Sequence, residues 1–185
     1  MNDGLQALGL VECTSIAAGI EAADAMLKAA RVAPFLVKTI CPGRFLAGVH
    51  GDVAAVQAAV GAGIAAGAET VADHFLIPRV SPEVISALAC AVEPVAGPSV
   101  GIIETYSAAS CILAADRAVK AARVCLAEVR LAMGLGGKAV CILCGDVSPV
   151  QAAVAAGAET AGESGLLVRR VVIPGMSPEL FAYIL

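Results

Sequence analysis

The sequence has few aromatic residues and few charges. Aromatic residues make up 3% of the 185 positions and tryptophan is absent, whereas 59% of the residues are hydrophobic. Charged residues account for only 15%. Ala and Val therefore supply most of the apolar surface, and we expect part of it to be covered by other subunits, because exposed apolar patches usually mark interfaces. The alternative is a monomer with an unusually apolar surface.

A basic excess and a long hydrophobic run are also lacking. The net charge of −4 argues against a nucleic-acid partner. The longest uncharged run, residues 53–68, consists mostly of Ala and Gly and is shorter than the ~20 strongly apolar residues that a membrane span needs. The first residues, Met1–Gly4, have neither the charge nor the apolar stretch of a signal peptide. We expect a cytoplasmic protein without a membrane partner.

The seven cysteines do not form a recognised cluster-binding run, since no Cys-x-x-Cys-x-x-Cys is present. Cys141 and Cys144 have Cys-x-x-Cys spacing, but they fall in a predicted strand, where positions i and i+3 point to opposite faces. We therefore predict buried thiols rather than a chelating pair. The same interpretation, small core or interface residues, applies to four others: Cys13, Cys90, Cys111 and Cys125.

Motifs of catalysis are missing as well. The glycine-rich segment 61–67 departs from the dinucleotide fingerprint in spacing and lies in a predicted helix, and residues 132–139 lack the Ser/Thr of a phosphate loop. His50 and His74 have no nucleophile in pattern with them, and no acid pair stands out. A monomeric redox enzyme thus has no supporting motif, and we predict that the protein is not an enzyme.

The chain contains the same domain twice. Matching stretches recur in the same order, first 92, then 94, then 96 residues apart, as expected for short insertions in loops. The pairs are Gly9–Glu12 with Gly101–Glu104, Ala22–Asp24 with Ala114–Asp116, Lys28–Val32 with Lys120–Val124, Gly51–Val53 with Gly145–Val147, Val56–Val60 with Val150–Val154, and Ser81–Glu83 with Ser177–Glu179. The predicted copies are residues 1–93 and 99–185, joined by the proline-containing linker 93–98.

Each copy is predicted to interleave strands and helices. The first copy should contain strands at 7–12, 35–40, 45–50 and 75–78, and helices from about 15 to 31 and from Asp52 onward. Pro42 and Gly43 indicate a turn between the second and third strands. In the second copy, strands are expected at 100–104 and 171–174, a helix at 107–123, and another helix that begins at Ser148-Pro149.

This order of elements, with Gly-x-x-Glu, Ala-Ala-Asp-x-x-x-Lys-Ala-Ala, Gly-Asp-Val and Ile-Pro in both copies, resembles the shell proteins of bacterial microcompartments. The resemblance covers nearly the whole chain. It implies an α+β fold, in which helices pack on an antiparallel-rich sheet. Two fused copies resemble the tandem-domain class, in which three chains form a pseudo-hexameric homotrimer, and the resemblance implies a structural tile in a microcompartment shell.

Two segments resemble the pore loops of the propanediol-utilisation members of that class, which carry an iron–sulfur cluster at the central pore. They are Thr39–Phe45, with Cys41, Pro42, Gly43 and Arg44, and the run Met133, Gly134, Leu135, Gly136, Gly137 and Lys138. The resemblance implies that Cys41 of three chains holds one [4Fe–4S] cluster per trimer, for electron transfer across the shell or for cluster delivery. Arg44 would add positive charge at the pore rim. The alternative is the same pore without a cluster, passing small metabolites.

The resemblance also implies how tiles meet. Lys28 and Lys120, each at the end of the first helix of its copy, are expected at the tile edge, with Arg79 as the partner edge residue. Gly175 stands where the second copy would repeat Arg79. The expected partners are other copies of the chain, other shell proteins beside it, and an encapsulated redox enzyme.

Overall fold

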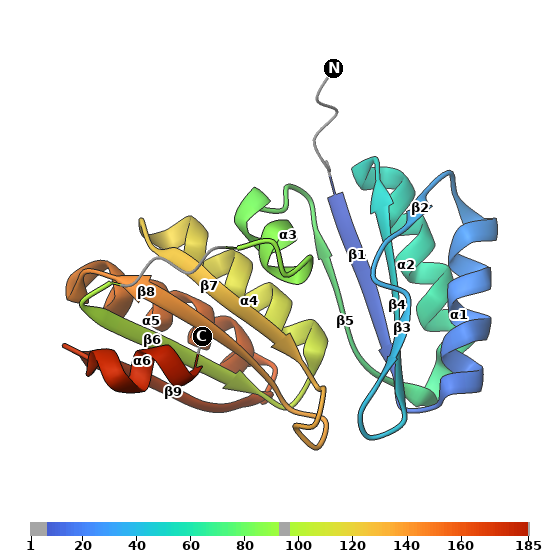
Figure 1. The fold of residues 1–185 in the computed structure, drawn as a ribbon. Coiled ribbons are helices and arrows are strands. Elements are labelled where there is room, and N and C mark those ends of the chain that lie inside the picture. Colours follow the sequence, from blue (N-terminus) through green and yellow to red (C-terminus); the bar gives the residue numbers. More distant parts are fainter. Residues whose placement is uncertain (1–6, 93–96, 185) are drawn as a thin grey trace. The chain divides into compact units, whose positions relative to one another are not determined.

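The computed structural model describes residues 7–92 and 97–184. These form two compact units, one of residues 7–80 with Ala132–Gly137 and the other of the remaining described residues. The first six residues and most of the predicted linker at 93–98 lie outside the described residues. Figure 1 follows the chain through both units.

The first unit is a sheet with two long helices. Its strands run in the order β2-β4-β1-β5, with β3 also paired to β4, and every pairing is antiparallel. The elements are β1 (Ala7–Cys13), α1 (Ile16–Ala29), β2 (Ala33–Pro34), β3 (Lys38–Ile40), β4 (Arg44–Gly51), α2 (Val53–Gly67), a 3-10 turn (Ala68–Thr70) and β5 (Val71–Ile77). Both α1 and α2 pack on the sheet and on each other (Figure 1).

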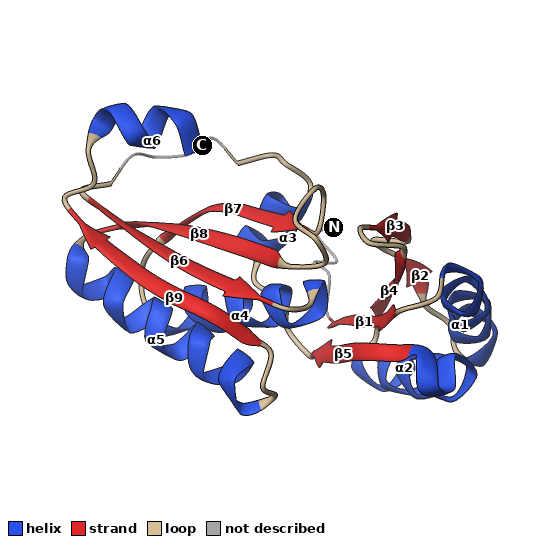
Figure 2. Cartoon of the chain, turned by 90° about the horizontal axis from the view of Figure 1, so that it is seen from below, coloured by secondary structure: helices blue, strands red, loops and turns tan. Residues whose placement is uncertain are grey.

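The second unit repeats this plan. Its sheet has the order β7-β8-β6-β9, again antiparallel throughout. The elements are α3 (Pro82–Leu88), β6 (Ser99–Thr105), α4 (Ala108–Ala121), β7 (Cys125–Leu131), β8 (Ala139–Gly145), α5 (Val147–Glu163), β9 (Leu167–Pro174) and α6 (Pro178–Ile184). The helices α4 and α5 cover one face of the sheet, and α6 lies over the other (Figure 2). The predicted α+β fold in two copies is confirmed.

The repeated Gly-x-x-Glu has a packing reason for its glycine. A Cβ atom at Gly9 would lie 2.5 Å from a methyl group of Val60 on α2, and one at Gly101 would lie 2.5 Å from a methyl group of Val154 on α5. Real Cβ atoms do not approach so closely, so only glycine lets these helices pack on the central strands. The buried core of the first unit then forms between the sheet and its helices.

Two local predictions need correction. The strand expected at 35–40 is interrupted between β2 and β3, because Leu36 adopts a φ of 58°. The helix expected from Ser148-Pro149 begins earlier, at Val147, so the proline lies in its first turn, where its missing N–H costs nothing. Asp52 lies at the N-cap of α2 as predicted, and its side chain accepts no capping hydrogen bond.

The short helices α3 and α6 were not predicted, although Ser-Pro-Glu at their starts places proline and an acid in the first turn. The helix α3 packs on β7 and α4. Residues 81–92, assigned to the first copy by sequence, therefore belong to the second unit by contact.

Among the described residues, one helix has the length and composition of a membrane span. It covers Val53–Thr70, which is α2 with the following 3-10 turn. In the first unit it packs on α1, β1 and β5, and 28% of the segment is buried. Length and composition alone are weak evidence for a span, since core helices meet the same criterion.

Candidate functional site

The predicted cysteine-bearing turn joins two strands of the first unit. Ile40 ends β3 and Arg44 begins β4, and the Gly43 N–H donates to the Ile40 carbonyl at 3.0 Å to close the turn. Gly43 has a φ of 86°, a conformation that favours glycine. Cys41 and Pro42 are exposed on this turn. We call residues 41–44 the cysteine turn.

The second predicted pore segment lies against this turn. Residues 132–137, here called the glycine loop, connect β7 to β8 but group with the first unit. The Cys41 N–H donates to the carbonyl of Ala132 at 3.0 Å, and a Cβ at Gly137 would lie 3.0 Å from the Pro42 ring. Met133 is exposed. Two segments about ninety residues apart in sequence are thus brought together.

A buried glutamate lies behind the cysteine turn. The Arg44 guanidinium donates to the Glu12 carboxylate at 2.6 Å, and the Glu12 side chain is fully buried. The Lys138 ammonium donates to the Glu104 carboxylate at 2.5 Å. This hydrogen bond raises the pKa of Lys138 above its ordinary value.

The two ion pairs occupy equivalent positions of the repeat. Glu12 is opposite Leu46 in the β1–β4 register, and Glu104 is opposite Val140 in the β6–β8 register. The glutamate of Gly-x-x-Glu therefore fixes the cation that ends each loop. Sequence analysis missed this role, although a glutamate inside an apolar strand already indicates a buried partner. Because Glu12 compensates Arg44, the turn carries less net positive charge than the sequence suggested.

The other cysteines differ from Cys41 in their surroundings. Cys141 and Cys144 are buried in β8, and they contact different neighbours. Cys141 is hydrogen-bonded with Cys111 of α4, and this bond raises the pKa of the Cys111 thiol well above its ordinary value. Cys144 faces Cys125 across the β7–β8 pairing, and burial raises the pKa of Cys144 to about 11. The prediction that Cys141 and Cys144 are buried is confirmed.

The remaining two cysteines, Cys13 and Cys90, differ in their burial. Cys13 is buried at the end of β1, and desolvation raises the pKa of its thiol. Cys90 is exposed, so it is not a core residue. Within residues 7–92 and 97–184, a single chain brings together no group of three or more potential metal ligands.

The predicted edge lysines end equivalent helices but have different environments. The Lys28 ammonium donates to the exposed carboxylate of Asp24 one turn earlier on α1. Lys120 makes the same i,i+4 pair with Asp116 on α4, where the carboxylate is buried. Arg79 is exposed after β5, and Gly175 follows β9 with a φ of 62°.

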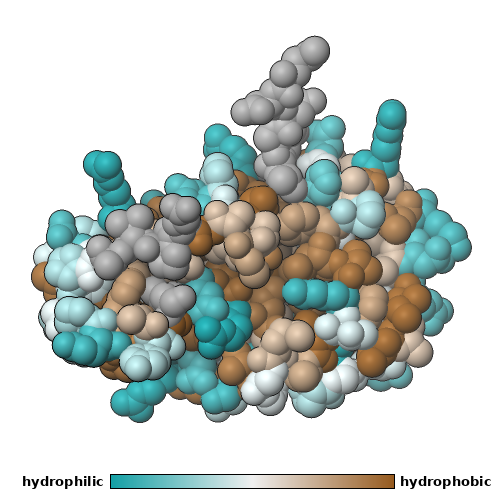
Figure 3. Space-filling view, in the orientation of Figure 1, coloured by the Kyte–Doolittle hydropathy of each residue, from teal (hydrophilic) through white to brown (hydrophobic). Residues whose placement is uncertain are grey.

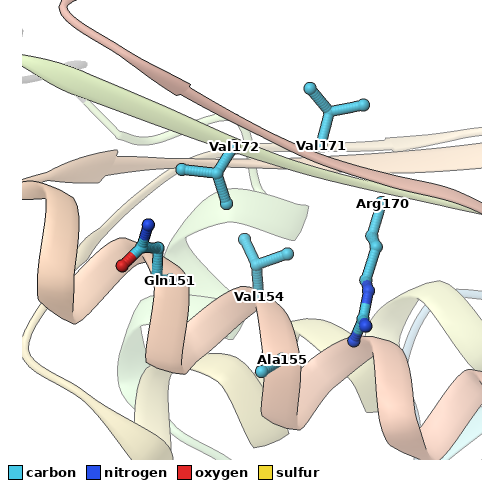
Figure 4. Close-up of a pocket in the computed structure, with 6 residues that line it drawn as sticks. All are labelled: Gln151, Val154, Ala155, Arg170, Val171 and Val172. Carbon is cyan, nitrogen blue, oxygen red and sulfur yellow. The ribbon is translucent and has the colours of Figure 1, made fainter.

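A hollow of about 280 Å³ between α5 and β9 offers no catalytic set. Figure 4 shows Val172 and Arg170 directed toward α5, while Val171 points away. The lining is mostly apolar, with Gln151 and Arg170 as its polar members and no nucleophile or acid among them. This pocket supports neither acid–base nor covalent catalysis.

Comparison with known proteins agrees with the repeat. Residues 7–80 and 99–176 each match the BMC domain. The chain is 48% identical, over 91% of its length and 92% of the relative's, to the bacterial microcompartment shell protein PduT of Citrobacter freundii. Part of it, 40% of the chain, is 50% identical to 80% of the shell protein EutM of Salmonella typhimurium.

Solved structures show the same architecture. A microcompartment protein from Desulfitobacterium hafniense superposes with a TM-score of 0.83 at 48% identity, covering 97% of this chain and 99% of its own. The fused permuted hexameric shell protein MSM0275 shares the fold at 21% identity and a TM-score of 0.63, covering 84% of this chain and 81% of its own. With its two matched domains and these relatives, the chain belongs to the BMC-domain family and is a shell protein of bacterial microcompartments.

Proposed function

We propose that three copies of this chain assemble into a pseudo-hexameric tile, with the cysteine turn and the glycine loop around a pore on the threefold axis. The duplication supports this, because two fused domains convert a ring of six into a ring of three. The small apolar side chains and sparse charge of the chain suit extensive burial between subunits.

We further propose that Cys41 of the three chains holds one [4Fe–4S] cluster at this pore. The donor chemistry of the turn fits such a group, because Cys41 is exposed while its own N–H is already bonded to Ala132. The thiol is therefore the group that each chain can present to a shared ligand. When bound, the cluster would supply one-electron redox chemistry for electron transfer across the shell, or would itself be delivered to an encapsulated redox enzyme.

The surrounding residues would hold the thiol in place. Gly43 shapes the turn, and the Glu12–Arg44 pair anchors the residue where the turn enters β4. The single observation that carries the proposal is the exposed Cys41 on a turn fixed at both sides, by Ala132 and by Glu12. Four of the other cysteines lie within or beside the second sheet, where Cys111 is hydrogen-bonded with Cys141 and Cys125 is opposite Cys144.

Sedimentation of anaerobically purified protein, followed in the ultraviolet and in the visible region, tests both parts. The proposal predicts one boundary at the mass of three chains, with visible absorbance moving in it. A colourless trimer would keep the tile and favour the alternative function, a pore for small metabolites. A monomer at micromolar concentration would contradict the tile itself.

A further inference from the structure

The helices that follow the last strand of each repeat differ in exposure. In α3, Val84 is fully buried and Ala87 nearly so. The equivalent residues of α6, which lie 96 positions later, are Leu180 and Tyr183, and they are 49% and 89% exposed. Phe181 of α6 packs on its own sheet, beside Ile142 and Cys144, and this leaves Leu180 and Tyr183 outside that contact. The two positions that are buried in α3 are thus exposed to solvent in α6.

Contacts with β7, α4 and the Asp116 carboxylate hold α3 in place. The helix packs on β7 and α4 in the second unit. At its start, the Ser81 N–H donates to Oδ1 of Asp116 at 2.9 Å, while Oδ2 of the same carboxylate accepts from Lys120. Asp116 is only 2% exposed, so these partners compensate for a buried charge.

The first unit has the same surface without such a helix. Its α1 is the repeat equivalent of α4, and Asp24 is the equivalent of Asp116. The Asp24 side chain is 60% exposed, and among residues 7–92 and 97–184 its carboxylate has Lys28 as its only partner. Ile20 is exposed where its equivalent Ile112 is fully buried, and Val37 is exposed beside β3. Figure 3 shows hydrophobic surface on this unit, toward the right of the view.

We propose that α6 of one chain docks on α1 and the β2–β3 edge of a second copy, as α3 docks on α4 and β7. Ser177, the equivalent of Ser81, would then donate its N–H to the partner subunit's Asp24. Leu180 and Tyr183 would cover the apolar surface that includes the partner subunit's Ile20. The occupant is a second copy of this chain because the internal repeat already supplies the complementary pair of surfaces.

This contact is head-to-tail, so each chain gives one α6 and receives another. A heterologous contact of this kind closes into a ring when the rotation permits. The inference rests on the proposed trimer and deepens it, since it assigns the residues that join one chain to the next. Within a chain, α3 makes the corresponding contact.

Two variants test the docking by sedimentation equilibrium over a range of protein concentrations. Leu180→Ser combined with Tyr183→Ser removes the apolar anchors, and Asp24→Ala removes the acceptor. Each is expected to raise the midpoint concentration for trimer dissociation at least tenfold. Glu21→Ala is the matched control, because Glu21 is an exposed acid one turn earlier on α1 and should leave the midpoint unchanged. Circular dichroism of the dissociated chains should remain that of the parent.

The possible outcomes distinguish the proposed α6 contact from the proposed trimer. A parent trimer whose midpoint is unaffected by either variant would overturn the docking and keep the proposed trimer. Loss of co-assembly with other shell proteins at an unchanged trimer midpoint would assign α6 to a neighbouring tile, and would also overturn it. A parent chain that is itself a monomer would contradict the proposed function and this inference together.

Discussion

At the scale of single residues, the two glutamates of the repeated Gly-x-x-Glu each form an ion pair, but they differ in burial. Glu12 is fully buried and pairs with Arg44, whereas Glu104 is partly exposed and pairs with Lys138. Removing one partner of a buried pair leaves an uncompensated charge, while exposed pairs contribute little. The two positions should therefore differ in their effect on stability.

We expect Glu12→Gln to lower the free energy of unfolding by about 1–3 kcal/mol. Its matched control, Glu104→Gln, should cost less than about 1 kcal/mol. Urea unfolding of both variants measures the difference. Equal losses would mean that burial of the Glu12–Arg44 pair has no energetic consequence.

The cysteines provide a second prediction at this scale. In protein freed of metal, an alkylating reagent at pH 8 should modify Cys41 and Cys90, which are exposed, and spare the buried Cys144. Burial raises the pKa of Cys144 to about 11, so only about one molecule in a thousand carries the reactive thiolate at pH 8. Labelling of Cys144 should rise only as the pH approaches that pKa. Peptide mass spectrometry reads each site, and early labelling of Cys144 would contradict the described packing.

At the scale of elements, the sequence predicted the helices and strands that have a periodic hydrophobic pattern or recur in both copies. The helices α1 and α4 begin after Ser15 and Ser107, whose side chains accept from Ala18 and Ser110 as N-caps should. The break between β2 and β3 was missed because Leu36 adopts a positive φ without glycine to indicate it. The helices α3 and α6 were missed because each has only seven residues, too few for a periodic pattern.

The site was predicted only in part, for a related physical reason. Sequence resemblance selected the cysteine turn and the glycine loop, and the structure brings them together through Cys41, Ala132 and Gly137. The carboxylates behind the cations depend on strand register, which the sequence alone does not fix.

Glycine in the cysteine turn gives a test at the element scale. Gly43→Ala meets no atom within 4 Å, so its cost is the backbone strain at a φ of 86°, about 1–2 kcal/mol. Gly61→Ala is the matched control, because Gly61 lies in α2 with equally open space, and alanine there should stabilise by about 0.5–1 kcal/mol. Thermal unfolding should show shifts of opposite sign, and shifts of the same sign would contradict the described turn.

At the scale of the whole molecule, side-by-side contact between tiles is predicted to depend on Lys28 and Lys120. We expect Lys28→Ala with Lys120→Ala to weaken sheet or shell assembly in electron micrographs while the trimer persists. Lys28→Ala alone is the cleaner probe, because Lys120 also compensates the buried Asp116. Sheets as extensive as those of the parent protein would rule out the edge role.

The central claim is that one pore cluster is shared by three chains through Cys41. Its most direct test is the iron and acid-labile sulfide content of anaerobically purified protein, compared with that of Cys41→Ser. We predict a [4Fe–4S] cluster in the ratio of one per three chains, and none in the variant, which should fold normally because Cys41 lies on an exposed turn. One cluster per chain, or a Cys41→Ser protein that keeps its iron, would contradict the account.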